Sequence, residues 1–256
     1  MIRPPRRILA PLAALVLAAC ATGPHPDVAG AQRALGRELV QTRDWARAFT
    51  VADAMVRERP NDAEGYILRG TVYREQNLLT ESEADLKDAV RLAPGSARAH
   101  SALAILYDMQ GRGDEALEHH RKASELEPRE PQYLNNLGFS LFAHGRPREA
   151  IKVLREAARS APADPRIRNN LGFAYAAAGD LTQAAEQFER GGTPAEAKIN
   201  LGWAYERRGS LTLAFDLYAE AIRIDPTAVR ARKNLTRVAH ELGRDVPPDV
   251  AAPPGT

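Results

Sequence analysis

Small side chains recur along the chain at a fixed spacing, and this pattern predicts pairs of closely packed helices. A first small residue returns every 34 residues, at Gly36, Gly70, Ala104, Gly138 and Gly172. A second follows each of them twelve positions later, at Ala48, Ser82, Ala116, Ala150 and Ala184. Two helices whose axes cross closely need small residues at the crossing. The pattern therefore predicts one antiparallel helix pair in every period.

Larger residues and prolines complete each period. Tyrosines or large apolar residues recur between the small positions, at Tyr73, Tyr107, Tyr175 and Tyr205 and at Leu86, Leu154, Phe188 and Tyr218. Prolines close the units, at Pro60, Pro94, Pro128 and Pro162. Proline ends a helix because it cannot donate to the helical hydrogen-bond ladder. A sixth unit follows 30 rather than 34 residues later, with Gly202, Ala214 and Pro226 in the corresponding places. We expect an all-α chain.

Three stretches carry a family resemblance: Asn136-Leu137-Gly138-Phe139, Asn170-Leu171-Gly172-Phe173 and Asn200-Leu201-Gly202-Trp203. Together with the 34-residue period, they resemble the first helix of the tetratricopeptide repeat. The resemblance extends over residues 29–243. It implies a right-handed superhelix, an α-solenoid, of about six helix pairs over residues 29–228. A capping helix over residues 229–243 would close it, because a solenoid needs a polar end for solubility.

The fifth unit departs from the repeat. It lacks four residues around Gly191-Gly192-Thr193-Pro194. We expect its second helix to be about one turn shorter than the others. Two interpretations remain for this shortening: a loop deletion that the fold tolerates, or a functional hinge.

The first nineteen residues read as an export signal. Residues 1–7 carry three arginines, and residues 8–19 are apolar or small apart from Pro11. This is the pattern of a signal peptide, and the apolar stretch is too short for a membrane-spanning helix, which needs roughly 20 residues. The stretch ends in Leu17-Ala18-Ala19-Cys20, which resembles the lipobox of bacterial lipoproteins. The alternative is an ordinary secretory signal with Cys20 incidental.

The lipobox resemblance implies where the mature chain lies. It implies that residues 1–19 are removed, that Cys20 is acylated, and that residues 20–28 form a flexible tether. Ala21 resembles the sorting residue of outer-membrane lipoproteins, so we expect the protein in the cell envelope, on the outer membrane facing the periplasm. The proline-rich residues 244–256 are expected to form a disordered tail.

Charge and cysteine content exclude several functions. Without the three arginines of the predicted leader, 32 basic residues face 33 acidic residues, a formal charge of −1. The mature chain therefore has no excess of positive charge to attract nucleic acid. Cys20 is the only cysteine, which excludes a disulfide framework and a thiolate metal cluster.

Register along the first helices identifies candidate groove residues. One column contains Asn136, Asn170, Asn200 and Asn234, and its neighbour contains Phe139, Phe173, Trp203 and Arg237. The asparagines resemble the ladder with which tetratricopeptide proteins hold extended peptides, and each side chain offers one acceptor and two donors. Aromatic side chains would add apolar pockets. Alternatively, the aromatics pack between neighbouring first helices and the asparagines are a common choice before Leu-Gly. We hypothesise that a protein or peptide partner binds units four to six.

No catalytic constellation is recognisable. The histidines are scattered: His25, His100, His119, His120, His144 and His240. His119 and His120 point about 100° apart on a helix and cannot chelate a metal as an i, i+4 pair does. His120 occupies a column that elsewhere holds Leu, Phe or Tyr, which predicts a packed core histidine. Phosphate-binding and nucleophile-elbow motifs are absent from the sequence. We expect no enzymatic activity, metal or cofactor.

Lipobox and repeats together resemble the lipoproteins of pilus biogenesis, namely TadD-type proteins of Flp pili and PilF/PilW-type pilotins of type IV pili. That resemblance implies a membrane-anchored scaffold that helps an outer-membrane secretin or another pilus component to assemble. Two alternatives remain: a general envelope adaptor, and a regulatory subunit that recruits a peptidoglycan or transport enzyme.

Overall fold

The computed structural model describes residues 27–251, and over this range the chain is built from helices with no β-strand. The first helices of the six units are α1 (Val28–Gln41), α3 (Ala63–Glu75), α5 (Ala97–Met109), α7 (Pro131–Ala143), α9 (Pro165–Ala178) and α11 (Pro194–Arg207). The second helices are α2 (Trp45–Glu58), α4 (Leu79–Leu92), α6 (Gly113–Leu126), α8 (Pro147–Ser160), α10 (Leu181–Arg190) and α12 (Leu211–Ile224). Two further helices follow, α13 (Val229–Leu242) and α14 (Pro248–Ala251).

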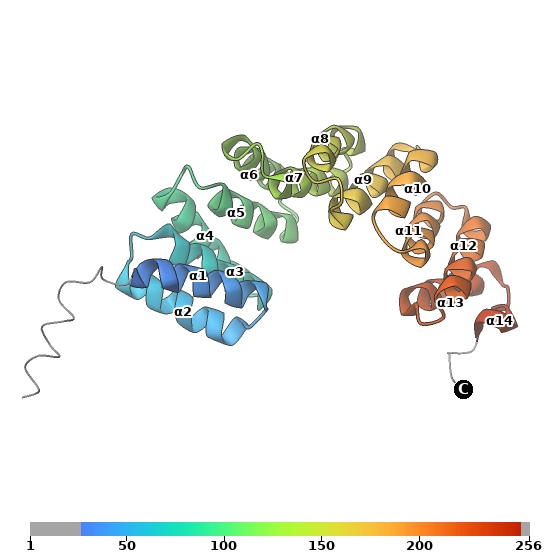
Figure 1. Ribbon diagram of the computed structural model, residues 1–256, viewed down its shortest axis with the longest axis horizontal. Helices are drawn as coiled ribbons and strands as arrows, with labels where there is room; N and C mark the ends of the chain where they lie inside the picture. Colours follow the sequence, from blue (N-terminus) through green and yellow to red (C-terminus); the bar gives the residue numbers. More distant parts are fainter. Residues whose placement is uncertain (1–26, 252–256) are drawn as a thin grey trace, which may run out of the picture.

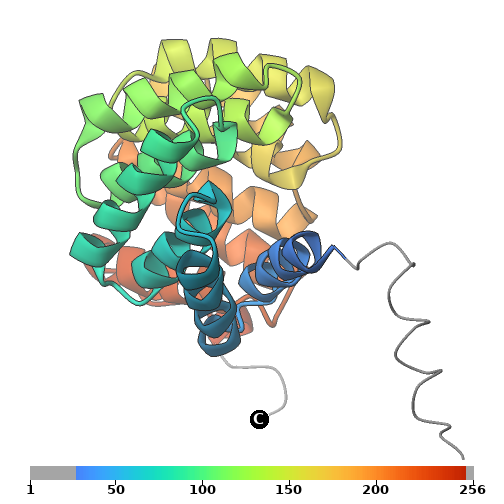
Figure 2. The same cartoon turned by 90° about the vertical axis from the view of Figure 1, so that its left-hand side faces the viewer.

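The helix pairs stack in chain order. Figure 1 shows them along an arch, with α1 and α2 at one end and α13 and α14 at the other. Seen from the side of α1 and α2, they follow a ring-like path (Figure 2). Each second helix packs against its own first helix and against the first helix of the next unit. The predicted all-α tetratricopeptide superhelix is confirmed.

Glycine and alanine lie where the two helices of a unit cross. A Cβ atom added at Gly138 would lie 2.4 Å from Cγ of Leu154, and one added at Gly172 would lie 2.5 Å from Cε1 of Phe188. Ala150 and Ala184, the small residues of the second helices, are fully buried. Larger side chains at these positions would push the helices apart. The recurring small residues therefore set the distance between the helices of a pair.

Prolines and side-chain caps begin several helices. Pro165 and Pro194 are the first residues of α9 and α11, where a missing N–H costs nothing. Thr193 Oγ1 accepts from the backbone N–H of Glu196 at 3.3 Å, and the Glu196 carboxylate accepts from the backbone N–H of Thr193 at 2.8 Å. This reciprocal capping box satisfies two N–H groups that the helix leaves free.

The fifth unit is shortened as predicted. Helix α10 has 10 residues, whereas α8 and α12 have 14 each. Its end is held by Asn169, whose Nδ2 donates to the backbone carbonyl of Gly191 at 2.9 Å. Gly191 is buried, so the missing turn is replaced by a packed and hydrogen-bonded connection.

The end of the chain differs from the expected disordered tail. Residues 244–251 are structured: α14 lies against α12, and Val250 is 1% exposed in the same core cluster as α12 and α13. Arg232 Nη1 donates to the backbone carbonyl of Val250 at 2.7 Å. The prediction of a tail from residue 244 is therefore wrong up to residue 251, because one apolar residue after Pro248 finds an uncovered apolar surface. Residues 252–256 lie outside the described range.

The predicted signal peptide and lipidated Cys20 also lie outside the described residues, and the tether is described only at 27–28. Val28 already belongs to α1, and Asp27 caps that helix by accepting from the Gly30 N–H at 2.8 Å. Between residues 27 and 251, no helix combines the length and the apolar character that crossing a membrane requires.

Candidate functional site

The first helices of the repeats form the inner surface of the arch. Each packs against the next first helix, from α1 and α3 to α9 and α11, whereas successive second helices make no comparable contacts within the described range. The side of the first helices that faces away from the second helices is therefore the concave surface of the solenoid. We call this surface over α5, α7, α9 and α11 the groove.

Asparagines of the groove are hydrogen-bonded from one repeat to the preceding one. The three bonds are Asn136 Nδ2 to Ser101 Oγ at 3.2 Å, Asn170 Nδ2 to Asn135 Oδ1 at 2.9 Å, and Asn200 Nδ2 to Asn169 Oδ1 at 3.1 Å. Asn200 is buried, and Asn136 and Asn170 are half-buried. These asparagines therefore stabilise the stacking of repeats three to six.

Register along the first helices did not identify the acceptors of this ladder, which are Ser101, Asn135 and Asn169. Its only sequence signal is the doubled asparagine, at Asn135-Asn136 and Asn169-Asn170. Asn234 is half-buried on α13 and lies outside the ladder. Oδ1 of Asn136, Asn170 and Asn200 accepts no hydrogen bond from the residues that the structure describes, so each oxygen has acceptor capacity left. Peptide binding by the asparagines stays a prediction.

The aromatic column divides into packed and exposed members. The ring centroids of Phe173 and Trp203 lie 5.1 Å apart with their planes at 82°, an edge-to-face contact between α9 and α11. Phe173 also contacts Phe188 of its own repeat at 4.9 Å. Phe139, by contrast, is 48% exposed. Phe173 and Trp203 therefore serve in packing between neighbouring helices, and Phe139 leaves about half of its surface exposed.

A cavity of about 610 Å³ opens where the ends of α7, α9 and α11 meet. Its lining is Phe142, Ala143, Gly145, Pro147, Ala176, Ala177, Trp203, Ala204, Arg207 and Arg208. The guanidinium of Arg207 lies 5.7 Å from the centroid of the Trp203 ring, a cation–π contact. Small side chains form much of this surface, with arginines at one end.

Asp108 collects three hydrogen bonds at the boundary of repeats three and four. Its Oδ2 accepts from His120 Nε2 at 2.9 Å, and its Oδ1 accepts from Ser140 Oγ at 2.8 Å and from His144 Nε2 at 2.9 Å. Burial raises the pKa of Asp108, but the hydrogen bonds from His120, His144 and Ser140 outweigh it and leave that pKa below its usual value. Asp108 is therefore a carboxylate at neutral pH.

His120 is 1% exposed, which confirms the predicted core histidine. Its Nδ1 is buried without a hydrogen-bond partner among the described residues. The helix pairing thus brings together two histidines, His120 and His144, that the sequence shows only as scattered residues. Among residues 27–251, no group of three or more His, Cys, Asp or Glu side chains has an arrangement that would hold a metal ion.

A second histidine pair joins α5 to α6. Nδ1 of His100 and Nδ1 of His119 lie 2.8 Å apart, and His100 Nε2 lies 3.1 Å from the carbonyl oxygen of Pro94. A carbonyl only accepts, so His100 donates from Nε2 and, when neutral, accepts at Nδ1 from His119. Burial and the neighbouring His100 lower the pKa of His119. This pair links the two helices of the third repeat.

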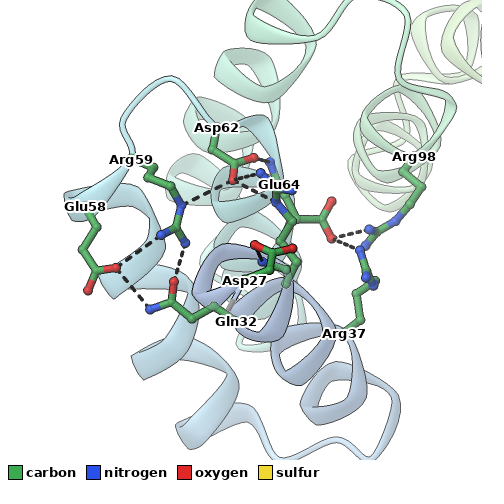
Figure 3. Close-up of polar contacts among 10 residues, drawn as sticks. Asp27, Gln32, Arg37, Glu58, Arg59, Asp62, Glu64 and Arg98 are labelled. Carbon is green, nitrogen blue, oxygen red and sulfur yellow. Dashed lines mark hydrogen bonds and ion pairs between the residues drawn. The ribbon is translucent and has the colours of Figure 1, made fainter. Parts of the chain in front are cut away.

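The concave surface of the first repeats is occupied by ion pairs instead. Figure 3 shows Arg37 of α1 and Arg98 of α5 both reaching Glu64 of α3. Arg33 donates to Asp62 at 2.9 Å on the same side. Charged groups that satisfy one another in this way leave little for a partner to bind. The apolar and amide-lined part of the concave surface begins at α5.

Comparison with known families identifies the class of protein. The family profile of the tetratricopeptide repeat matches residues 67–131, 135–194 and 190–229. These ranges cover more than half of the chain and coincide with the stacked helix pairs. The chain belongs to the tetratricopeptide-repeat family, whose solenoids present extended concave binding surfaces to other proteins.

Among particular proteins, the chain resembles pilus biogenesis factors. It is 32% identical over 80 residues to the type IV pilus assembly protein PilF of Pseudomonas aeruginosa, which is 31% of this chain and 32% of that protein. The match thus spans about a third of the curated relative. The solved structure of Pseudomonas aeruginosa PilF superposes with a TM-score of 0.62 at 16% identity, covering 81% of this chain and 96% of that one.

Two further structures share the fold. PilW, a type IV pilus biogenesis factor, gives a TM-score of 0.68 at 18% identity, over 82% of this chain and all of PilW. YrrB, a tetratricopeptide protein with an unusual peptide-binding site, gives a TM-score of 0.54 at 25% identity, over 72% of this chain and 95% of YrrB. These likenesses show the tetratricopeptide fold.

Proposed function

We propose that this chain is a lipid-anchored scaffold of the bacterial cell envelope that assists pilus assembly. In this proposal, acylated Cys20 holds the solenoid to the outer membrane, and the groove binds an extended segment of an outer-membrane secretin or another pilus component. The observation that carries the pilus assignment is the 32% identity to a type IV pilus assembly protein over 80 residues. The anchor rests on the lipobox-like residues that end at Cys20.

The groove supports binding of an extended segment rather than of a compact surface. Asn136, Asn170 and Asn200 repeat along it at the spacing of the repeats, each with a free side-chain oxygen. Extended peptides expose an N–H at regular intervals along the chain. Phe139 and the cavity near Trp203 add apolar contact area for side chains of the partner.

Capture from membranes tests this function. Cells that make pili would express the full chain with a C-terminal tag, and the proteins crosslinked to it would be identified. Recovery of a secretin or a pilus protein supports the proposal. Recovery of a peptidoglycan or transport enzyme, with no pilus protein, would replace it with the adaptor or regulatory-subunit alternative. Cys20→Ala tests the anchor, because the variant should leave the membrane fraction.

A bulky variant in the cavity tests the groove without disturbing the asparagine ladder. Ala177 is exposed in the cavity, so Ala177→Arg should block partner capture while the helical content stays unchanged. Ala163→Arg is the matched control, because Ala163 is exposed in the turn between α8 and α9. Equal capture by both variants would place the binding surface elsewhere.

A further inference from the structure

A second cavity, of about 290 Å³, lies between α5 and α7, beside Asn136, the first asparagine of the ladder. Its lining is Ile105, Asp108, Met109, His120, Asn136, Phe139, Ala143 and His144. We propose that this cavity binds a lysine side chain of the protein partner, with its ammonium group at Asp108. The inference rests on the proposed scaffold function and names the chemistry of one contact within it.

The walls of the cavity suit the apolar stem of a long side chain. Met109 is 53% exposed and Phe139 is 48% exposed, although both are large apolar residues. They stand on neighbouring first helices, so a side chain that enters between them would contact both. Lysine buries its four-carbon stem on apolar surface while its charged tip reaches a polar group.

Asp108 supplies a negative charge that no lysine or arginine of the described chain neutralises. Its partners in the structure are Ser140 and two histidines, with no lysine or arginine among them. The arginines that follow α5 and α7 are engaged elsewhere: Arg112 pairs with Glu115 and Arg146 with Glu149. A partly buried carboxylate gains from an added cation because the low dielectric strengthens their attraction.

The acceptor sites that remain on Asp108 favour an ammonium over a guanidinium. A carboxylate offers about four acceptor sites, and Asp108 uses three of them. One site on Oδ2 is left, which suits a single N–H and not the two parallel bonds of an arginine. Asn136 lines the same cavity, and its Oδ1 accepts no hydrogen bond from the described residues. An ammonium has three donors, enough for an oxygen of Asp108 and for Oδ1 of Asn136.

Methyl NMR of methionine tests this site directly. The chain has three methionines; Met109 lines the cavity, while Met55 is fully buried in the second helix of the first repeat. The full chain, labelled with ¹³C at the methionine methyls, would be titrated with Nα-acetyl-lysine methylamide. The Met109 signal should shift and saturate while the Met55 signal stays in place. Nα-acetyl-norleucine methylamide has the same stem without the ammonium. It should bind at least about ten-fold more weakly than the lysine probe.

Two variants separate the cation contact from the stem contact. Asp108→Asn should reduce lysine binding to the level of norleucine, and Phe139→Ala should weaken both probes. An unchanged helical content by circular dichroism shows that each variant is folded. If Asp108→Asn fails this check, the lysine–norleucine ratio in the folded Phe139→Ala variant decides, because it should stay near ten-fold.

Equal binding of lysine and norleucine would overturn the proposal, and so would tighter binding of Nα-acetyl-arginine methylamide. A site for an apolar residue or for arginine would then be present instead. These titrations use no pilus protein, so their failure leaves the scaffold function intact, and failure to capture a pilus protein leaves the lysine site intact.

Discussion

Asp108 in the third repeat and Glu206 in the sixth hold equivalent positions, and each accepts a hydrogen bond of 2.9 Å from the side chain twelve residues later, His120 or Tyr218. The second, fourth and fifth repeats place leucine or phenylalanine at that second-helix position, and the first repeat places alanine there. His120 and Tyr218 carry a polar atom into the buried seam, and a buried donor needs an acceptor. The acid on the first helix provides it.

The two acids differ in how their charge is balanced. Arg237 of α13 donates to Glu206 at 2.8 Å, whereas Asp108 has, among residues 27–251, histidine and serine partners only. The acid of the sixth repeat is therefore paired with an arginine, whereas the equivalent acid of the third repeat, Asp108, has no arginine or lysine partner among the described residues. This difference is the reason why the lysine site is proposed at Asp108.

Replacing Tyr218 by phenylalanine should destabilise the sixth repeat. The ring would still pack against Gly202, but Glu206 would lose a buried donor. We expect a loss of about 1–2 kcal/mol, as for other hydrogen bonds to charged groups. Thermal unfolding followed by circular dichroism measures it. Tyr66→Phe is the control, since the Tyr66 hydroxyl bonds to Pro60 O at the surface; equal losses would contradict the expectation.

The same tyrosine should make stability fall in alkali. Burial and the hydrogen bond to Glu206 raise the pKa of Tyr218 above its ordinary value, which is about 10 in the unfolded chain. The folded state then holds this proton more tightly, so the stabilisation is complete below pH about 10 and is lost as the pH rises further. Melting temperatures between pH 8 and 11 should drop more steeply for the parent chain than for Tyr218→Phe, and parallel curves would refute this.

Gly138→Ala tests the close approach of α7 and α8. The added methyl would lie 2.4 Å from Leu154 Cγ, so a side chain or a helix has to move, at a cost of about 1–3 kcal/mol. Gly95→Ala adds the same methyl where nothing lies within 4 Å and should be neutral or slightly stabilising. Denaturant unfolding compares them; if Gly138→Ala were as stable as Gly95→Ala, the seam would be looser than the distances indicate.

Glu83 should account for part of the loss of stability in acid. The hydrogen bond from Lys87 contributes most, and those from Arg112 and Gln110 add to it; together they outweigh burial and lower the pKa of Glu83 to about 2. Its stabilisation is present above the unfolded pKa of about 4.3 and is lost as the pH falls toward 2. Because its cationic partners are largely exposed, we expect about 1 kcal/mol.

Glu83→Gln should therefore flatten the dependence of unfolding free energy on pH between 5 and 2. Glu81→Gln, an exposed residue of the same helix, serves as the comparison and should follow the parent chain. If the unfolding free energy of Glu83→Gln depended on pH as steeply as that of the parent chain, this carboxylate would not contribute to the loss of stability in acid.

Loss of the Asn200 amide should loosen the contact between repeats five and six only. Asn200→Ala removes the hydrogen bond to Asn169 in a buried position, at an expected cost of about 1–2 kcal/mol. Since repeats in a solenoid interact with their neighbours alone, hydrogen exchange should quicken in α11 to α13 and stay unchanged in α1 to α4. Asn234→Ala, in the same column outside the ladder, should have little effect; uniform quickening along the whole chain would contradict the expectation.

The sequence by itself determined the architecture. Gly138 and Gly172 act within one repeat, where each faces a large residue sixteen positions later, so the spacing alone specifies a helix pair. The missing turn of α10 could also be predicted from the sequence, because a deletion in a strict repeat shortens one element. The asparagine and aromatic columns were also legible from register.

Only the tertiary structure decided which side chains meet across repeats. Asn170 reaches Asn135 over 35 residues, and His144 reaches Asp108 over 36, and both contacts depend on how far each repeat rotates against the last. The docking of Val250 likewise required the apolar surface that α12 and α13 leave uncovered. The spacing of residues within a repeat does not predict that rotation, because the rotation arises from the packing of whole helices.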